Sequence, residues 1–222
     1  MRKRSESERV SSATEDYLKA ILRLEIEGRP ASTGAIADLL DVSQPSVTAM
    51  TKKLAAEGLV ERQAYRGVTL TKRGRLIALE VLRHHRLLER FLADTLGLPL
   101  DQVHAEAERL EHALSEQLEE RIDAALGFPT HDPHGDPIPG IDLELADKEG
   151  RLLLDLEPGE RSTVVRVPDR ADVLRYLREL SLLPGTTVEV LLAAPLGGPI
   201  TVRAGESDHA ISRDLAAAIV VA

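Results

Sequence analysis

Apolar residues recur at helical spacing in three segments near the start of the chain. The first predicts a helix from 12 to 27, with Ser12 as its N-cap, and the second a short helix over 32–40. The third predicts a helix over 45–57 with proline in its first turn, a position where proline is favoured. Its inward-facing residues are expected to be Val47, Met50 and Leu54.

Two short alternating segments, 59–63 and 68–71, predict strands around a hairpin tip at 64–67. Three helices followed by a two-stranded wing predict a winged helix-turn-helix, a module whose third helix lies in the major groove of DNA.

Longer helices are predicted next, over 72–96 and 100–126. Prolines and glycines between 127 and 159 predict a linker with little regular structure. The remaining segments predict a small β-barrel, with strands at 163–167, 187–192, 200–203 and 217–221 and a helix at 172–180. The fold class is therefore mainly α with a small β part. Four segments are expected: 1–75 for DNA binding, a helical domain over 76–140, a linker over 141–160 and the barrel over 161–222.

Composition is that of an ordinary globular protein, with 43% hydrophobic and 29% charged residues. No apolar run approaches a membrane span, and the basic start of the chain has no apolar stretch behind it, so no membrane partner and no signal peptide are expected. The chain has no cysteine, which excludes disulfides and thiolate metal sites and favours a cytoplasmic location.

The net charge of −9 argues at first against nucleic-acid binding, because phosphate affinity comes largely from lysine and arginine. Residues 1–75, however, hold 14 basic and 10 acidic residues, a net of +4, whereas residues 76–222 hold 14 and 27, a net of −13. We call residues 1–75 the basic head and residues 76–222 the acidic body. Such a division of charge suggests that the two regions have separate functions.

The basic head carries polar groups where the third helix would meet DNA. Short polar or helix-starting residues stand at its N-terminal end: Ser43, Gln44, Pro45, Ser46 and Thr48. Basic side chains expected to contact backbone phosphates are Lys52 and Lys53 on the same helix and Arg62 and Arg66 on the wing.

The acidic body carries imidazole and carboxylate groups one helical turn apart. His85 and Glu89 are four residues apart on one predicted helix, and the next helix has a stripe of four such residues, His104, Glu108, Glu111 and His112. Two such sets on consecutive helices predict a site for a divalent ion. Carboxylate-rich sites without sulfur suit manganese or magnesium-like ions. Of two further histidines, His84 is expected at the surface or facing a partner, and His209 in a solvent-exposed turn.

The chain resembles the diphtheria-toxin-repressor family of metal-dependent transcriptional regulators along nearly its whole length. The resemblance rests on several motifs in order: 13–18 (Ala-Thr-Glu-Asp-Tyr-Leu), 43–48 (Ser-Gln-Pro-Ser-Val-Thr), 84–92 (His-His-Arg-Leu-Leu-Glu-Arg-Phe-Leu), Glu111-His112 and 134–140 (His-Gly-Asp-Pro-Ile-Pro-Gly). It implies that the tail is an SH3-like (FeoA-like) domain.

The resemblance also implies two metal sites. The regulatory site would use Asp16, Glu108, Glu111 and His112. The ancillary site would use His85, Glu89 and His104, completed from the linker or the tail, where the candidates are Asp132, His134, Asp169 and Asp172. Iron-type members resemble this set but have methionine in place of Asp16 and cysteine in place of Glu108. Lys19 stands where some manganese-type relatives have a second N-terminal glutamate.

The function implied is a homodimeric, manganese-responsive repressor that binds double-stranded operator DNA at an inverted repeat. Apolar residues expected to pack at the dimer surface include Leu87, Leu88, Phe91 and Leu92. An iron-responsive regulator with Fe²⁺ in place of Mn²⁺ is the first alternative. A metal-dependent hydrolase would need a water nucleophile and a substrate pocket, and it leaves the basic winged module unexplained. A third alternative is a protein-interaction module that uses the prolines between 129 and 139.

Overall fold

The structure is a computed structural model that describes residues 10–63, 67–146 and 150–222. The chain divides into two units. One takes in the chain up to residue 84 together with residues 139–144, and the other takes in residues 85–138 and 145–222. Among the helices of the described ranges, none has the length and apolar character needed to cross a membrane.

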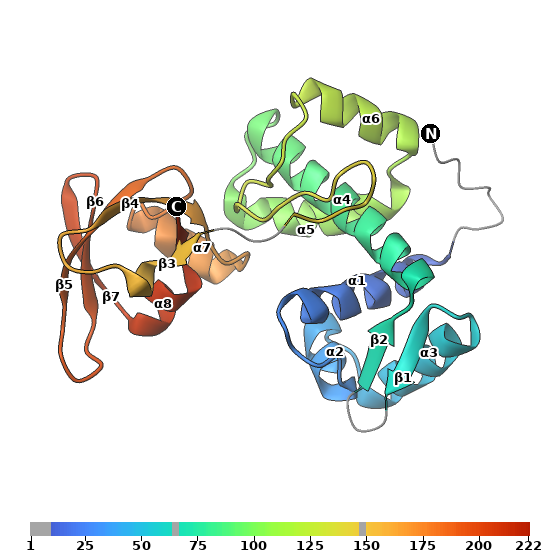
Figure 1. Ribbon diagram of the computed structural model, residues 1–222. Coiled ribbons are helices and arrows are strands. Elements are labelled where there is room, and N and C mark those ends of the chain that lie inside the picture. The colour runs from blue at the N-terminus through green and yellow to red at the C-terminus, as the bar shows by residue number, and fades with distance from the viewer. Residues whose placement is uncertain (1–9, 64–66, 147–149) are drawn as a thin grey trace. The chain divides into compact units, whose positions relative to one another are not determined.

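The first unit contains a winged helix-turn-helix, as predicted (Figure 1). Its elements are helices α1 (Ser12–Ile26), α2 (Thr33–Leu40) and α3 (Gln44–Ala56) and the antiparallel strands β1 (Val60–Gln63) and β2 (Gly67–Leu70). Glu25 on α1 accepts the backbone N–H of Leu70 at 3.0 Å and pairs with Arg75 at 2.6 Å. The wing is thereby joined to the first helix. The predicted hairpin tip at 64–66 lies outside the described residues.

Side-chain caps set the starts of these helices. Ser11, rather than the predicted Ser12, caps α1 by accepting the N–H of Thr14. Ser43 caps α3 in the same way, because its hydroxyl accepts the N–H of Ser46. The inward face of α3 also differs from the prediction: Thr51 is buried where Met50 was expected. Burial of Thr51 is tolerated because its hydroxyl donates to the backbone carbonyl of Val47.

Helix α4 (Lys72–Asp94) leads into the helical part of the second unit. The predicted single helix over 100–126 is wrong, since the chain forms α5 (Leu100–Leu110), the 3₁₀ turn η2 (Glu111–Ala113) and α6 (Glu116–Ala125). Leu114 is extended, and Ser115 starts α6 by accepting the N–H of Leu118. No glycine or proline marks this break. The apolar repeat continues across it, and for that reason the sequence pattern predicts a single helix.

A small apolar core joins these helices. It contains Leu87, Leu88, Leu92, Val103, Ala107, Ile122 and Ile138, with Phe91 packed against it. The expectation that Leu87, Leu88 and Leu92 form a dimer surface is therefore wrong, because they are buried within the chain itself. His84, expected at the surface or facing a partner, is also buried within the chain itself.

The stretch after α6 is an ordered loop rather than a loose linker. One Asp132 carboxylate oxygen accepts the backbone N–H groups of His134 and Asp136, both at 2.9 Å. The buried Arg86 donates to the carbonyl of Pro137 and lies 3.5 Å from Asp132. Gly135 has φ of 95° and approaches the carbonyl of Val165 so closely that a Cβ would lie 1.9 Å from that oxygen. Polar contacts, rather than apolar periodicity, fix this loop.

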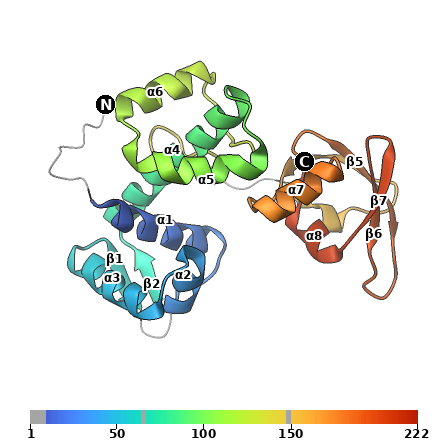
Figure 2. The ribbon, with the colours of Figure 1, turned by 180° about the vertical axis from the view of Figure 1, so that it is seen from behind.

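The C-terminal part of the second unit is a six-stranded sheet in the order β3-β8-β4-β5-β6-β7, which confirms the predicted small β domain. Figure 2 shows its strands β5, β6 and β7 together with helices α7 and α8. Its elements are β3 (Arg151–Leu152), η3 (Leu153–Asp155), β4 (Arg161–Arg166), α7 (Ala171–Glu179), β5 (Thr187–Ala193), β6 (Ile200–Ala204), β7 (Ser207–Ile211), α8 (Arg213–Ala218) and β8 (Val220–Val221). Leu174 and Leu177 of α7 share one core with Val188 and Val190 of β5.

Three features of this part differ from the sequence prediction. His209, expected in an exposed turn, lies half-buried in β7 opposite Val202. The segment predicted as a strand at 217–221 begins as α8, which Ser212 caps by accepting the N–H of Leu215. The expected linker over 141–160 contains β3, a strand of two residues that is too short to give an alternating pattern.

Candidate metal centre and DNA-reading face

Four side chains from three segments of the second unit converge around Glu89. His85 and Glu89 lie one turn apart on α4, His104 lies on α5, and Asp169 lies just before α7. Glu89 Oε1 is 3.0 Å from His85 Nε2 and 3.2 Å from His104 Nδ1. Asp169 Oδ2 is 2.7 Å from the same nitrogen of His104. One donor atom from each residue lies within 4.8 Å of every other, a spacing that suits a metal ion.

The loop after α6 adds two buried groups to this cluster. His134 is fully buried, and its Nδ1 atom has no hydrogen-bond partner among the described residues. That nitrogen lies 3.8 Å from Glu89 Oε2, and the Nε2 atom lies 3.6 Å from Asp169. Asp132, His134 and Glu89 form a second overlapping group of potential ligands. A buried polar atom without a partner is costly, so a cation ligated by this nitrogen would complete the site.

Of the four residues predicted to complete the ancillary site, three lie near Glu89 and one does not belong to a ligand group. Asp132, His134 and Asp169 lie around Glu89. Asp172 does not belong to any ligand group among the described residues; it is exposed and pairs with Arg170 at 2.7 Å.

Charges within this cluster shift the pKa values of its members. The Asp169 carboxylate, followed by that of Glu89, raises the pKa of His104 to about 10. Burial raises the pKa of Asp132 to about 7, and the Glu89 charge adds to the effect. Burial also acts to raise the pKa of Glu89, but the charge of His85 and the neighbouring imidazoles hold this pKa well below its usual range. The cluster thus concentrates negative charge in a buried volume and favours cations.

A second group lies on the other side of the His85 ring. Glu111 is fully buried, and its Oε2 atom lies 2.6 Å from His85 Nδ1. Glu108 Oε1 is 3.8 Å from the same nitrogen, and His112 Nε2 is 3.5 Å from Glu111 Oε1. The two nitrogens of His85 therefore face the two predicted ligand sets. Asp16, the remaining predicted ligand, is half-buried on α1 in the first unit.

The chemistry of these donors fits a divalent ion of hard or intermediate character. Every donor is a carboxylate oxygen or an imidazole nitrogen. Carboxylates suit Mg²⁺, Ca²⁺ and Mn²⁺, and imidazole suits Fe²⁺ and other transition metals, so the set is compatible with both manganese and iron.

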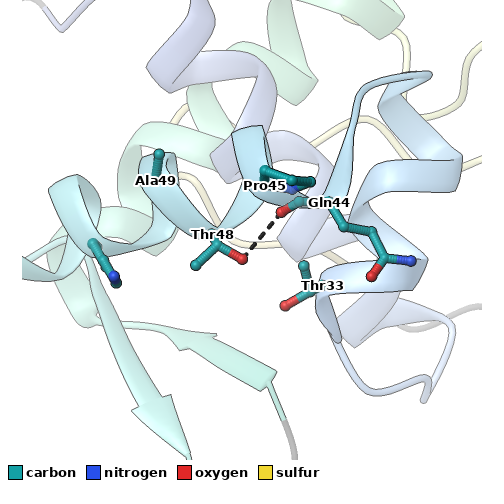
Figure 3. Close-up of a pocket in the computed structure, with 6 residues that line it drawn as sticks. Thr33, Gln44, Pro45, Thr48 and Ala49 are labelled. Atoms are coloured by element: carbon teal, nitrogen blue, oxygen red, sulfur yellow. Dashed lines mark hydrogen bonds between the residues drawn. The ribbon is translucent and has the colours of Figure 1, made fainter.

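The start of α3 forms an open pocket together with α2, shown in Figure 3. It is lined by Thr33, Gln44, Pro45, Thr48, Ala49 and Lys52. The predicted DNA contacts Ser43, Gln44, Pro45, Ser46, Lys52, Lys53 and Arg62 are exposed, whereas Thr48 is half-buried. Arg66 lies outside the described residues.

Sequence reasoning missed Thr33 and Ala49 in this pocket. Ala49 lies one helical turn after Pro45, so its position could have been found from helical spacing. Thr33 belongs to the preceding helix, and no local pattern in the sequence links it to α3.

Three family models match successive parts of the chain. They are the iron dependent repressor N-terminal DNA binding domain over residues 9–68, the iron dependent repressor metal binding and dimerisation domain over 71–140, and the FeoA domain over 151–222.

Individual proteins match over almost the full length. The iron-dependent repressor IdeR of Mycobacterium leprae is 35% identical over 94% of this chain and 96% of its own. A manganese-dependent transcriptional repressor solved in complex with manganese is 39% identical, with a TM-score of 0.85 over 94% of this chain and 98% of its own. The manganese regulator SloR is 32% identical, with a TM-score of 0.77 over 94% and 97% of the two chains. The chain therefore belongs to the iron-dependent, or diphtheria-toxin-repressor, family and is a metal-dependent transcriptional repressor.

Proposed function

We propose that this repressor responds to manganese and binds an inverted-repeat operator as a homodimer. The observation that carries the proposal is the donor chemistry: among the described residues, the side chains grouped as potential ligands around Glu89 and Glu111 are carboxylates and imidazoles. Sulfur ligands would favour softer ions, and the chain has no cysteine to supply a thiolate.

The ancillary ion would be held by His85, Glu89 and His104, with Asp169 and the buried His134 completing the set. Asp132 would contribute either as a ligand or by holding the loop that carries His134. The support for this assignment is the convergence of these groups and the unpartnered Nδ1 atom of His134.

The regulatory ion would be held by Glu108, Glu111 and His112. Glu108 and Glu111 are carboxylates, and Glu111 is fully buried. We assign Asp16 to the same ion from the resemblance and from its donor type. Lys19 departs from the pattern of those relatives that have a second N-terminal carboxylate, so the proposal includes no ligand at that position.

A bound divalent ion would supply positive charge that offsets the repulsion between these carboxylates. If Asp16 on α1 shares the ion, metal binding is coupled to the arrangement of the DNA-binding module. By linkage, operator DNA then raises metal affinity by the same factor as metal raises operator affinity.

The DNA-binding half of the proposal has its own support. The family models match a DNA-binding part over residues 9–68 and a metal-binding and dimerisation part over residues 71–140. A symmetric dimer would present its two α3 helices to half-sites about one turn of DNA, roughly 34 Å, apart.

An iron response is the second candidate. The full-length relative IdeR is named iron-dependent, and three imidazoles near Glu89 are also good ligands for Fe²⁺. The two candidates differ in which metal activates operator binding when oxygen is absent.

The regulatory assignment is tested by titrating Mn²⁺ into a Glu108→Ala variant and measuring operator binding by fluorescence anisotropy. We expect the metal-dependent gain in operator affinity to be lost. The matched control is Glu106→Ala, on the same helix, where the carboxylate is half-buried like that of Glu108 but pairs with Arg109 at 3.1 Å. This variant should respond to Mn²⁺ as the native protein does. Metal-independent, undiminished operator binding by Glu108→Ala would contradict the proposal.

A further inference from the structure

Four polar side chains stand at the start of α3, but three of them already have hydrogen bonds within the protein. The hydroxyls of Ser43 and Ser46 are 2.8 Å apart, and Ser43 also accepts the N–H of Ser46. Thr48 Oγ1 donates to the carbonyl of Gln44 at 3.0 Å. Within the described residues, the side-chain amide of Gln44 has no such partner, and the residue is exposed. Gln44 is thus the polar group best able to read a ligand.

The Gln44 side chain extends over the start of α2. Its Nε2 atom lies 3.9 Å from the point where a Cβ on Gly34 would stand. In Figure 3 the amide lies to one side of the pocket, beside Thr33. The amide therefore forms one wall of the pocket, with both its N–H₂ and its oxygen available.

Apolar groups form the middle of the pocket. Pro45 and Ala49 are both exposed there. Because the Thr48 hydroxyl donates to a backbone carbonyl, its methyl group is the part of the side chain left to contact a ligand. The pocket combines one amide with a small patch of methyl and methylene groups.

A free cation stands at the other end of the pocket. Lys52 is exposed and makes no ion pair within the described part of the chain, whereas Lys53 pairs with Glu57 at 3.9 Å. Gln44 and Lys52 are two helical turns apart, roughly 12 Å along the helix axis. That separation lets the amide lie within the major groove while the ammonium group reaches a phosphate.

We infer that this pocket reads an adenine and a neighbouring thymine methyl in the major groove of each half-site. The Gln44 amide donates to N7 of adenine and accepts from its N6 amino group. The C5-methyl of thymine packs against Pro45, Ala49 and the Thr48 methyl. Arginine and lysine read guanine, and carboxylates read cytosine. No arginine or carboxylate lines the pocket, and its one lysine, Lys52, lies two helical turns from Gln44, where it is placed to reach a phosphate. The inference rests on the proposed operator binding and adds its base preference.

The first test uses the full-length, Mn²⁺-loaded protein to select duplexes from a randomised library. We expect an A·T pair at one fixed position in each half-site. Gln44→Ala should lower affinity for the selected duplex by about 5- to 150-fold and remove the preference at that position only. Replacing the contacted adenine by 7-deazaadenine should lower the affinity of the native protein for the duplex and leave the affinity of Gln44→Ala unchanged.

The second test separates the methyl contact from the hydroxyl. Uracil in place of the contacted thymine deletes only the methyl group and should weaken native binding by about fourfold. Thr48→Ser keeps the hydroxyl and should reduce this uracil penalty, whereas Thr48→Val keeps a methyl group and should retain it.

These tests distinguish the inference from the function on which it rests. If the Mn²⁺-loaded protein selects no sequence at all, the proposed function fails and the inference with it. If it selects a sequence but Gln44→Ala keeps every base preference, or the uracil penalty is the same in Thr48→Ser and the native protein, the inference alone is overturned.

Discussion

The Nδ1 atom of His104 on α5 lies 2.7 Å from a carboxylate oxygen of Asp169, in the segment just before α7. This contact connects the helical part of the second unit with its SH3-like part. A backbone hydrogen bond from Val167 to the carbonyl of His134 reinforces the connection at 3.0 Å. The C-terminal domain thereby delivers a carboxylate to a cluster whose other members belong to α4, α5 and the loop after α6.

The ancillary site should depend on Asp169 and not on its near neighbour Asp172. Asp169→Ala removes a carboxylate next to His104 and should weaken Mn²⁺ binding at this site by about tenfold or more. Asp172→Ala removes an exposed carboxylate that pairs with Arg170, and it serves as the matched control. Isothermal titration of Mn²⁺ into each full-length variant gives the comparison. Equal affinities in the two variants would show that the C-terminal domain supplies no ligand.

Stability of the metal-free protein should fall as the pH rises, from about pH 4 to 7 through Asp132 and from about pH 6.5 to 10 through His104. The folded-state pKa of Asp132 is raised to about 7 and that of His104 to about 10. A raised pKa means that the stabilising contribution is complete below the unfolded-state value and is lost as the pH rises through the folded-state value. The melting temperature in chelator, measured as a function of pH, tests this expectation. In the His104→Gln variant, the decrease at the upper end of the pH range should be smaller.

Added Mn²⁺ should stabilise the protein more at pH 8 than at pH 6. A ligating imidazole must lose its proton, and His104 holds that proton up to a pKa of about 10. Proton competition therefore weakens as the pH rises. The measurement is the shift in melting temperature on adding Mn²⁺ at each pH. An equal or smaller shift at pH 8 would contradict the participation of His104.

Two glycines of the DNA-binding module should respond in opposite ways to alanine. A Cβ on Gly74 would lie 2.0 Å from the carbonyl oxygen of Leu59, so Gly74→Ala must displace backbone and should destabilise the module by several kcal/mol. Gly34 is in the first turn of α2 with 3.9 Å to its nearest neighbour, and Gly34→Ala should be neutral or stabilising by up to about 1 kcal/mol. Urea unfolding of both variants tests the packing of α4 against the segment between α3 and β1.

The two adjacent lysines of α3 should differ in their effect on DNA affinity. Lys52→Ala removes an exposed amine without an ion pair and should lower affinity evenly across sequences, reducing the salt slope by about one per contacted phosphate. Lys53→Ala should have a smaller effect, because Glu57 already pairs with that amine. Operator affinity measured at several salt concentrations compares them. A larger salt effect for Lys53→Ala would reverse the assignment.

The elements and the ligand stripes could be predicted because each arises from local periodicity. One-turn spacing placed His85 beside Glu89, and the apolar pattern predicted α1, α2 and α3. The break between α5 and α6 could not be predicted, since a serine cap competes with an uninterrupted apolar repeat. The loop with Asp132 and His134 is fixed by side-chain to backbone hydrogen bonds. Such hydrogen bonds produce no repeating pattern in the sequence, so the sequence alone does not predict them.

The DNA-reading face shows the same limit. Polar residues at the start of α3 were recognisable from their position, but their hydrogen bonds were not. The Thr48 hydroxyl is engaged within the helix, so a residue predicted to donate to DNA presents its methyl group instead. Only the folded geometry separates Gln44 from its neighbours.

The most direct test of the central claim compares Mn²⁺ and Fe²⁺ as activators of operator binding under anaerobic conditions. The full-length protein is first treated with chelator, and each metal is then titrated against a fluorescent operator duplex at buffered free concentrations. The account predicts no operator binding in chelator, and stronger binding with Mn²⁺ than with Fe²⁺ at matched free metal. Equal or stronger activation by Fe²⁺, or operator binding in chelator, would contradict a manganese-responsive repressor.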